Sequence, residues 1–391
     1  MLDCLLRQLP LLSVMACRRI AVQRGSWALL LMCSILPGCS REAATRDAAD
    51  AGPRLRLLHA VTLREDSAHF LARPVAMRVQ PTGGAFILSD IGTNRVSVFS
   101  RTGEFQREFG QPGSGPGELE GPAAVFEVGD TLLAVYNMGH RSLLLFDSRT
   151  ARFLRNIRLP GYPSSAQPLV RRDTAWLGAR NPGTGRGIVA VDLATDSAAE
   201  MLPLPTEYAR YPETARFSGT PIAGGDGDTL IVGWSPFEPI WIVDRQTGRI
   251  DTVAVPRRAR RGTVRASLEA AGGGLEDIVE RVSAIGGIGR LHGGEIVLVH
   301  FDKRVPAPAI RRIVSEVFVS VLDLRRDQAC VDARVPATGD ALPVVALAGD
   351  SLFVLSQTVA DSSVTTRIAA YAIETSDCRW EPARHGAPFL E

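Results

Sequence analysis

Short hydrophobic runs separated by polar turns extend along most of the chain, and almost no segment keeps a helical period. The runs are rich in Val, Ile, Leu and aromatic residues, and Gly, Pro, Asp or Asn stands at their ends. Such runs are typical of short β-strands joined by tight turns. The pattern therefore predicts an all-β protein, in which we expect helix only as a short insertion around residues 264–282.

A pair of these predicted strands occurs six times. The first strands are residues 84–90, 130–137, 173–178, 228–234, 294–300 and 350–356, and the second strands are residues 96–99, 143–146, 188–191, 240–243, 317–322 and 368–371. The copies are 45–52 residues apart, with one longer interval of 79 residues. This period is that of a four-stranded antiparallel blade, so the sequence predicts a six-bladed β-propeller over residues 55–391.

Two segments compete for the outer strand of the last blade. Residues 55–63 have the pattern of an outer strand that precedes the first copy, and pairing with the last blade would close the ring. Residues 378–382, which follow the last copy, could fill the same position. The sequence leaves both alternatives open.

The N-terminal residues have the pattern of a bacterial export signal. Arg18, Arg19 and Arg24 precede a short apolar run at residues 27–35. This run is shorter than the roughly 20 residues that span a bilayer. We therefore expect export rather than a transmembrane helix.

Residues 36–39 read Leu-Pro-Gly-Cys, which resembles the lipobox of bacterial lipoproteins. We expect a lipoprotein signal peptide over residues 1–39, acylation of Cys39 and a flexible tether over residues 40–54. These features predict a protein of the cell envelope that its lipid holds to a membrane. We expect it on the outer membrane, facing the periplasm. An ordinary signal peptide with an incidental cysteine is the alternative.

Charge and cysteine content narrow the picture further. The net charge is +2, and about −1 without residues 1–39, so nothing favours a nucleic acid partner. Besides Cys39, only Cys330 and Cys378 lie beyond the signal peptide. An even pair in an exported protein predicts a disulfide, with two unpaired buried thiols as the alternative.

One stretch resembles the NHL type of six-bladed propeller, and the whole repeat resembles TolB-like propellers. It runs from Asp90-Ile-Gly-Thr-Asn-Arg95 through the strand that ends at Phe99 to Gly115-Pro-Gly-Glu118 and Pro122. The second copy keeps Gly139-His140-Arg141, and the later copies keep only the strands. The resemblance implies the fold, and equivalent places for Arg95 and Arg141 that suggest a repeated structural role.

The same resemblance suggests an enzymatic alternative, because propeller lyases of this type hold a metal on histidines in the central channel. His140, His292 and His300 stand at non-equivalent blade positions, which argues against one shared ion. Lactonase-like propellers use channel carboxylates and Asn, for which Asn94 and Asn137 are candidates without a matching Glu.

Two functional hypotheses follow from these observations. The first is a non-catalytic binding or scaffolding lipoprotein for an envelope protein, peptide or glycan, with no cofactor, no metal and no catalytic residue. The second is a metal-dependent hydrolase or lyase with its site in the channel.

The acidic stretch at residues 224–228 is interpreted as a turn between strands rather than as a calcium site.

Loop lengths predict which face binds. Turns between the first and second and between the third and fourth strands of a blade are short, whereas long connections occur at residues 110–121, 205–220, 256–285 and 302–315. Antiparallel pairing places all long connections on one face. The expected binding residues there are Arg257, Arg258, Arg260, Arg261, Arg265, Arg304, Arg311, Trp234 and Phe237, for an acidic glycan, peptide or protein surface. A solvated arginine-rich loop is the alternative.

Overall fold

The computed structural model describes residues 52–390 except residues 82, 164–166, 218, 271–277, 305–313, 337–342 and 361–362. The chain divides into two units, residues 1–41 and 42–391, and every described residue belongs to the second. The predicted signal peptide, Cys39 and most of the predicted tether therefore lie outside the described residues. Within the described part, no helix is both long enough and apolar enough to cross a membrane.

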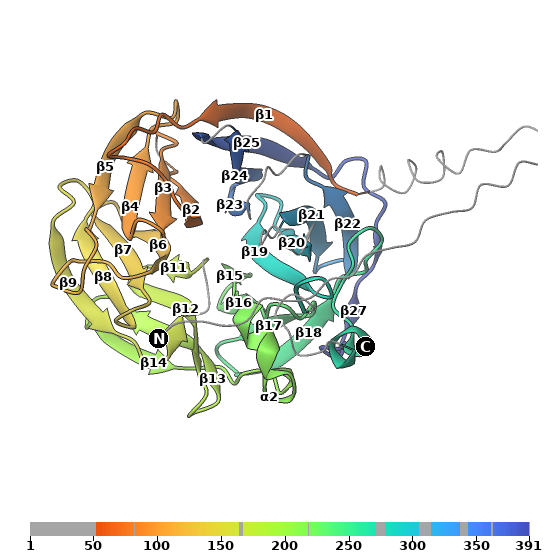
Figure 1. Cartoon of the computed structure of the whole chain (residues 1–391). Helices are drawn as coiled ribbons and strands as arrows, with labels where there is room; N and C mark the ends of the chain where they lie inside the picture. The colour runs from red at the N-terminus through yellow and green to blue at the C-terminus, as the bar shows by residue number, and fades with distance from the viewer. Residues whose placement is uncertain are drawn as a thin grey trace, which may run out of the picture. The chain divides into compact units, whose positions relative to one another are not determined.

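Six antiparallel sheets form a ring, as the sequence predicted (Figure 1). From the channel outward, blade one is β2 (Pro74–Val79), β3 (Phe86–Asp90), β4 (Arg95–Phe99) and β5 (Phe105–Phe109), and blade two is β6 (Pro122–Val128), β7 (Leu132–Asn137), β8 (Ser142–Asp147) and β9 (Phe153–Arg158). In blade three, β10 (Tyr162–Pro163) and β11 (Leu169–Arg171) both pair with β12 (Thr174–Asn181), which is followed by β13 (Arg186–Asp192) and β14 (Ser197–Glu200).

The other three blades have the same order. Blade four is β15 (Ile222–Gly224), β16 (Thr229–Gly233), β17 (Ile240–Asp244) and β18 (Ile250–Ala254). Blade five is β19 (Ser283–Arg290), β20 (Ile296–Arg304), β21 (Val314–Asp323) and β22 (Gln328–Arg334). Blade six is β23 (Val344–Ala348), β24 (Ser351–Ala360), β25 (Ser363–Glu374) and β1 (Arg54–Thr62).

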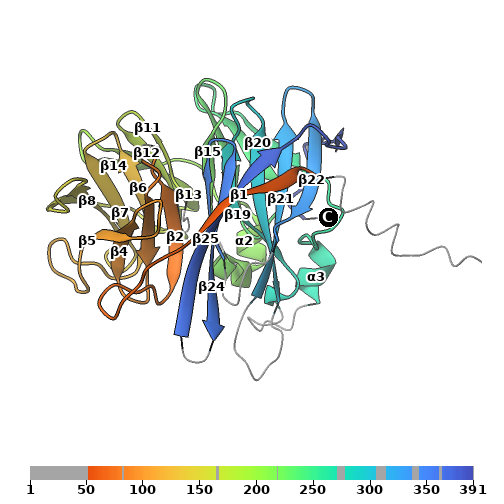
Figure 2. The same ribbon diagram turned by 90° about the horizontal axis from the view of Figure 1, so that it is seen from above.

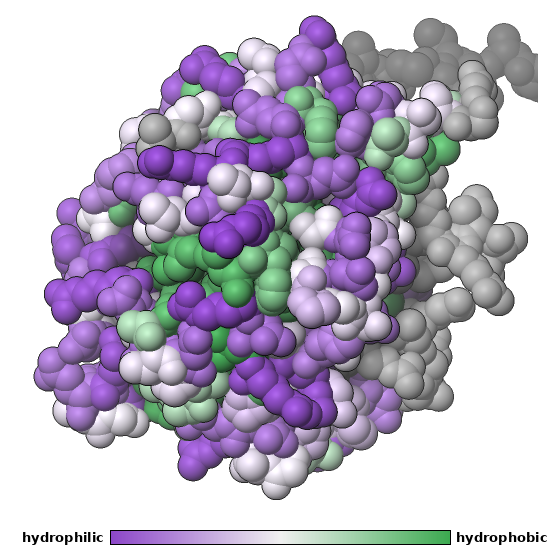
Figure 3. Space-filling model, turned by 90° about the vertical axis from the view of Figure 1, so that its left-hand side faces the viewer, coloured by the Kyte–Doolittle hydropathy of each residue, from purple (hydrophilic) through white to green (hydrophobic). Residues whose placement is uncertain are grey.

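The hydrophobic core lies between neighbouring blades. Every residue of β3 is buried, because this inner strand packs on both faces of its sheet. Met77 and Phe86 of blade one, for example, share a buried cluster with Val344 and Leu355 of blade six. A single blade has no partner for its two apolar faces, so the ring as a whole buries them. On the side where β5 and β9 lie, hydrophilic side chains cover most of the surface, with a hydrophobic area in a central hollow (Figure 3).

An aspartate builds the turn after the third strand in four blades. The side chains of Asp147, Asp192, Asp244 and Asp323 each accept hydrogen bonds from the backbone N–H groups two and three residues ahead, at 2.8–3.3 Å. These bonds lower the pKa of the first three carboxyl groups. The acidic residue that recurs after the second predicted strand is therefore a turn residue.

The ring closes through β1, which pairs antiparallel with β25 from Arg54 opposite Glu374 to Thr62 opposite Arg367. The predicted closure by residues 55–63 is confirmed. The competing segment, residues 378–382, instead adds a fifth strand to blade five, because β26 (Glu381–Pro382) pairs with β22. Just beyond it, β27 (Arg384–His385) pairs with β18 and adds a fifth strand to blade four.

Residues 375–390, here called the C-terminal strap, thus pass from blade six over blade five to blade four (Figure 1). Cys378 in the strap forms a disulfide with Cys330 of β22, with the two Cα atoms 5.7 Å apart. Farther along, Leu390 is buried and Phe389 packs against Trp241 of β17. The strap thus joins blades six, five and four along their outer edges.

In the part of the chain that the structure describes, helix occurs in connections between blades, both within the expected insertion and outside it. In the insertion around residues 264–282, α3 covers only Arg265–Glu269 before the undescribed residues 271–277. Two further short helices, α2 (Glu207–Arg210) and a 3₁₀ helix (Pro212–Phe217), lie between blades three and four. They are one or two turns long, too short to leave a helical period in the sequence.

The long connections share one face with the free end of the β24–β25 hairpin, as Figure 2 shows for α2 and α3. We call this the loop face; it contains residues 63–73, 201–217, 219–221, 255–270 and 278–282. Every innermost strand begins at it, because each follows a connection from the preceding blade.

Candidate functional site

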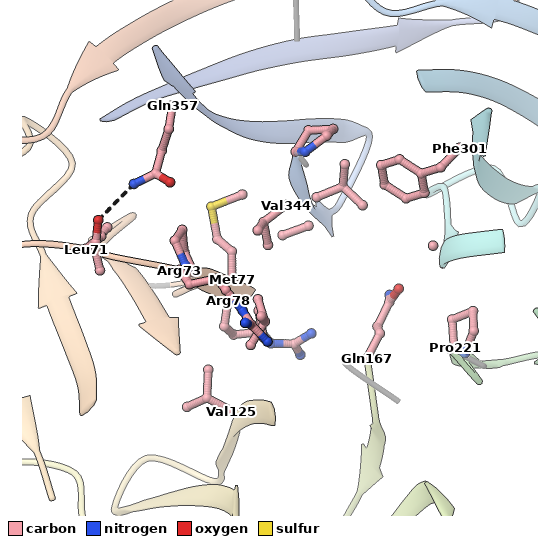
Figure 4. A pocket seen from close by; sticks show the side chains of 18 of the residues that line it. Leu71, Arg73, Met77, Arg78, Val125, Gln167, Pro221, Phe301, Val344 and Gln357 are labelled. Carbon is pink, nitrogen blue, oxygen red and sulfur yellow. Dashed lines mark hydrogen bonds between the residues drawn. The ribbon is translucent and has the colours of Figure 1, made fainter. Parts of the chain in front are cut away.

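The innermost strands surround a cavity of about 1240 Å³ in the central channel. Its lining reaches from residues 65–73 of the loop face along β2 to Arg78. All six blades contribute to it: Met77, Val125, Gln167, Pro221, Phe301 and Val344 come from blades one to six in turn (Figure 4). This volume exceeds the roughly 300–1000 Å³ of ordinary small-molecule sites.

The cavity wall is mostly apolar, and its apolar character continues to the rim. Phe70, Val359 and Val364 line the cavity although their side chains are 50%, 55% and 49% exposed. The two valines belong to the β24–β25 hairpin, whose last residues are exposed. Large side chains exposed together at the mouth of an apolar cavity are a feature of binding sites.

Arg78 is the charged group on β2 that faces this cavity. It is half-buried, and its guanidinium points into the open space (Figure 4). Among the described residues, none forms a hydrogen bond or an ion pair with it. The carboxylate of Glu127 acts on it from beyond ion-pair distance and is itself bound by Gln80 at 2.7 Å. Burial lowers the pKa of Arg78.

The two amide side chains of the cavity are already engaged. Gln167 donates to the carbonyl of Ile288 at 2.5 Å and accepts from its N–H at 3.0 Å, which ties blade three to blade five. Gln357 donates to the carbonyl of Leu71 at 2.9 Å. These amides hold the channel wall together.

Further charged groups lie toward the mouth. Lys303 and Arg73 line the cavity there, together with Glu65 and Asp66. Burial lowers the pKa of Lys303, and burial also raises the pKa of Glu65, which accepts the Leu71 N–H at 2.6 Å. Asp66 bonds the backbone and ring of His69, and these bonds lower its pKa.

Arg260, a predicted binding residue, is a buried structural group instead. Its side chain has no exposure, and it pairs with Asp332 and, at 3.0 Å, with Glu238. It also donates to the carbonyls of Pro256 and Val255 at 3.0 and 2.8 Å. These bonds fix the connection between blades four and five, so no ligand reaches this guanidinium.

Three neighbouring arginines also have partners within the protein. Arg257 pairs with Glu238 at 3.2 Å, Arg258 pairs with Glu381 of the C-terminal strap, and Arg261 donates to the carbonyls of Glu280 and Lys303. Most arginines of the predicted binding surface therefore stabilise the connection between blades four and five.

Two more of the predicted arginines lie nearby. Arg304 pairs with Glu316 on β21, Arg265 begins α3, and Arg311 lies outside the described residues.

The two predicted aromatic contacts are core residues. Trp234 and Phe237 are completely buried in the cluster between blades three and four. Tyr208 of α2 packs edge-on against both rings and donates to the carbonyl of Ser235 at 2.5 Å. The expectation that they touch a ligand is wrong, because they anchor the helical connection.

The three histidines of the enzymatic alternative do not meet. His140 lies 3.5 Å from Glu120, His292 lies 3.0 Å from Asp350, and His300 is fully buried in β20. In the part of the chain that the structure describes, no three His, Cys, Asp or Glu side chains form a group able to hold a metal ion.

The asparagines suggested for a lactonase-like site bind backbone groups: Asn94 lies in a turn, and Asn137 ends β7. Asn94, at φ 54°, accepts the Gly121 N–H at 2.8 Å, and buried Asn137 accepts the Glu120 N–H at 2.8 Å. The stretch that resembles NHL repeats has the same kind of role: Asp90 accepts backbone N–H groups of Gly92, Thr93 and Arg73 at 2.7–2.9 Å.

Arg78 was not among the predicted binding residues. The available signal was a lone arginine between hydrophobic neighbours in the segment that precedes the first turn of blade one. That segment is the innermost strand, where a side chain that points out of the core points into the channel.

Comparisons with known proteins support the fold. A family model described as a 6-bladed beta-propeller, DUF5128, matches residues 75–189, which is less than half of the chain. A search of curated proteins gave no match.

Solved structures give the same result over more of the chain. A DUF4221 family member from Bacteroides vulgatus has a TM-score of 0.56 at 12% identity, covering 83% of this chain and 99% of its own. A Bacteroides fragilis protein whose name describes it as exported has a TM-score of 0.54 at 13% identity, covering 83% and 96%. The WD40 repeats of RRP9 reach 0.52 at 10%, covering 82% and 99%. Such low identities show the fold alone.

Proposed function

We propose that this chain is an exported, lipid-anchored propeller of the cell envelope that binds its ligand in the central channel without catalysis. The observation that carries the proposal is the open apolar cavity, with the guanidinium of Arg78 facing it and unpaired among the described residues. Residues 18–39 support the export and anchoring parts. The stretch at residues 90–122 supports placement among NHL-type propellers.

The proposed site differs from the arginine surface expected from the sequence, although it opens on the same face. The arginines of residues 257–261 are engaged in the protein, whereas the channel offers an accessible concave surface. Concave apolar sites with few polar groups are the usual form of small-ligand sites. The ligand we propose is therefore a small molecule in place of a protein, peptide or glycan.

Filling the channel tests this proposal. The propeller lies within residues 42–391, so a protein truncated before residue 42 retains every described strand. We expect the neutral fluorescent probe N-phenyl-1-naphthylamine to bind this protein saturably, at one site. Val345→Trp, at a half-buried residue of β23 that lines the cavity, adds an indole there and should weaken probe binding at least about tenfold, the effect of roughly 1.4 kcal/mol, with an unchanged melting temperature.

Leu58→Trp is the matched control, because Leu58 is 43% exposed on the outer strand β1. It should leave probe binding unchanged. Equal loss in both variants, or a probe signal that never saturates, would contradict the channel as the binding site.

A further inference from the structure

We infer that the channel takes an amphipathic monocarboxylate, whose carboxylate pairs with Arg78 and whose apolar chain extends toward the rim. The inference rests on the proposed function, since it names the ligand class of that same site. It combines three observations: a cation inside the channel, Arg78, that no described residue pairs with, an apolar wall, and an apolar rim.

The first step concerns Arg78. A guanidinium partly removed from water and without a partner is costly, and its planar fork fits a carboxylate through two parallel hydrogen bonds. Glu127 does not fill this role, because it bonds Gln80 and stays beyond ion-pair distance. An incoming carboxylate would supply the missing acceptor.

The depth of Arg78 sets the orientation of the ligand. It stands four residues beyond Pro74, which begins β2 at the loop face. At ~3.3 Å per residue this is roughly 13 Å along the strand. A carboxylate at Arg78 therefore places the rest of the ligand between Arg78 and the mouth.

The wall along that path favours a chain with few polar groups. Met77, Phe301 and Val344 line it, and the amides of Gln167 and Gln357 are already bonded to backbone groups. A peptide or sugar would bury many donors and acceptors against apolar surface, which costs free energy unless each finds a partner. An alkyl chain has none to satisfy.

The rim completes the match. Phe70, Val359 and Val364 are half-exposed and would cover the outer part of an alkyl chain. At the mouth, charged side chains of both signs line the cavity: Glu65 and Asp66 with Arg73 and Lys303. Deeper in the channel, Arg78 is the charged group, and it favours an anion over a neutral or positive head group.

The test compares two probes that differ only in the head group: dodecanoate and dodecan-1-ol, each displacing N-phenyl-1-naphthylamine from the truncated protein. We expect dodecanoate to bind the wild type about 10- to 100-fold more tightly than the alcohol, the range for a hydrogen bond to a charged group. Arg78→Met should remove this preference and leave dodecan-1-ol affinity within about threefold. Arg101→Met, which removes an exposed cation in the turn between β4 and β5, outside the cavity lining, is the matched control and should keep the preference.

Several outcomes would overturn the inference. Equal affinity of the two probes in the wild type, or the same preference for dodecanoate in Arg78→Met with an unchanged melting temperature, would exclude Arg78 as the carboxylate partner. Tighter binding of a short peptide with a free C-terminus than of dodecanoate would contradict the ligand class. In each case the neutral probe still reports whether the channel binds a ligand, so the proposed function is judged separately. If Arg78→Met fails to fold, Arg78→Gln replaces it with the same expected loss of preference.

Discussion

The guanidinium of Arg260 lies between blades four and five, where the carboxylates of Glu238 and Asp332 compensate its charge. These interactions raise the pKa of Arg260 and lower that of Asp332. Removing one member of such a buried group leaves an uncompensated charge, so a single substitution there is strongly destabilising. Arg260 thus fixes the connection between blades four and five to both blades.

His300 is buried beside this pair and titrates unusually. Among the described residues, neither ring nitrogen has a hydrogen-bond partner, and burial together with the charge of Arg260 lowers the pKa of His300 well below 6.5. The folded protein therefore keeps His300 neutral at a pH where the unfolded chain protonates it. Stability supplied in this way is present above pH ~6.5 and falls as the pH drops below that value.

Replacing His300 with Phe should flatten the acid side of the stability profile. One proton taken up on unfolding costs about 1.4 kcal/mol per pH unit well below ~6.5, so the wild type should lose about 1.4 kcal/mol in all between pH 7.5 and 5.5 through this residue alone. Free energies of unfolding in urea at pH 5.5 and 7.5 measure the difference. The same pH dependence in His300→Phe and wild type would contradict this account.

His385 provides a control of opposite sign. Its ring bonds Asp251 at 3.1 Å and Asp327 at 2.8 Å, and these bonds raise its pKa. Its contribution is therefore present below pH ~6.5 and is lost as the pH rises through its folded pKa. His385→Gln should reduce stability at acidic pH more than at alkaline pH, by a small amount because the ring is 41% exposed.

At the scale of elements, the C-terminal strap is the unusual part of this propeller. Its short strands β26 and β27 add only two residues each to the edges of blades five and four, so backbone pairing alone holds it weakly. The disulfide at one end and the buried Leu390 with Phe389 at the other fix it in place. Sequence pattern could not reveal these two strands, because two-residue strands have no periodicity.

Reducing the disulfide should destabilise the propeller measurably. Cys330 and Cys378 are 48 residues apart, and a loop of that length corresponds to about 4 kcal/mol in the chain-entropy model. We expect a reductant to lower the urea midpoint of the wild type. The double variant Cys330→Ala/Cys378→Ala should unfold at a lower midpoint in both conditions and be insensitive to reductant. A wild-type midpoint that does not change with reductant would contradict a stabilising role.

Across the whole molecule, what the sequence could predict follows from how local each signal is. Strands such as β3 and β7 carry their own apolar pattern and turn residues, and the sixfold repeat of that pattern specified the ring. The partners of Arg260 and Trp234 come from residues far along the chain or from a neighbouring blade, and composition does not encode such contacts. The channel site is formed by residues of all six blades. The position of Arg78 in a cavity could therefore be recognised only in the closed ring.

The last prediction concerns how the whole protein is held in the cell. Residues 1–41 and the propeller are separate units, so loss of the anchor should leave the channel intact. With two or three acyl chains on Cys39, each buried methylene contributes ~0.8 kcal/mol, and membrane attachment should be effectively permanent. Cys39→Ser should therefore move the protein from the membrane fraction into the unanchored fraction, while affinity for N-phenyl-1-naphthylamine, measured on protein from either fraction after detergent removal, stays the same.

Mass spectrometry of the wild type should find acylated Cys39 as the N-terminal residue. An unmodified N-terminus at another position would contradict the lipid anchor, and the channel would then belong to a freely exported protein.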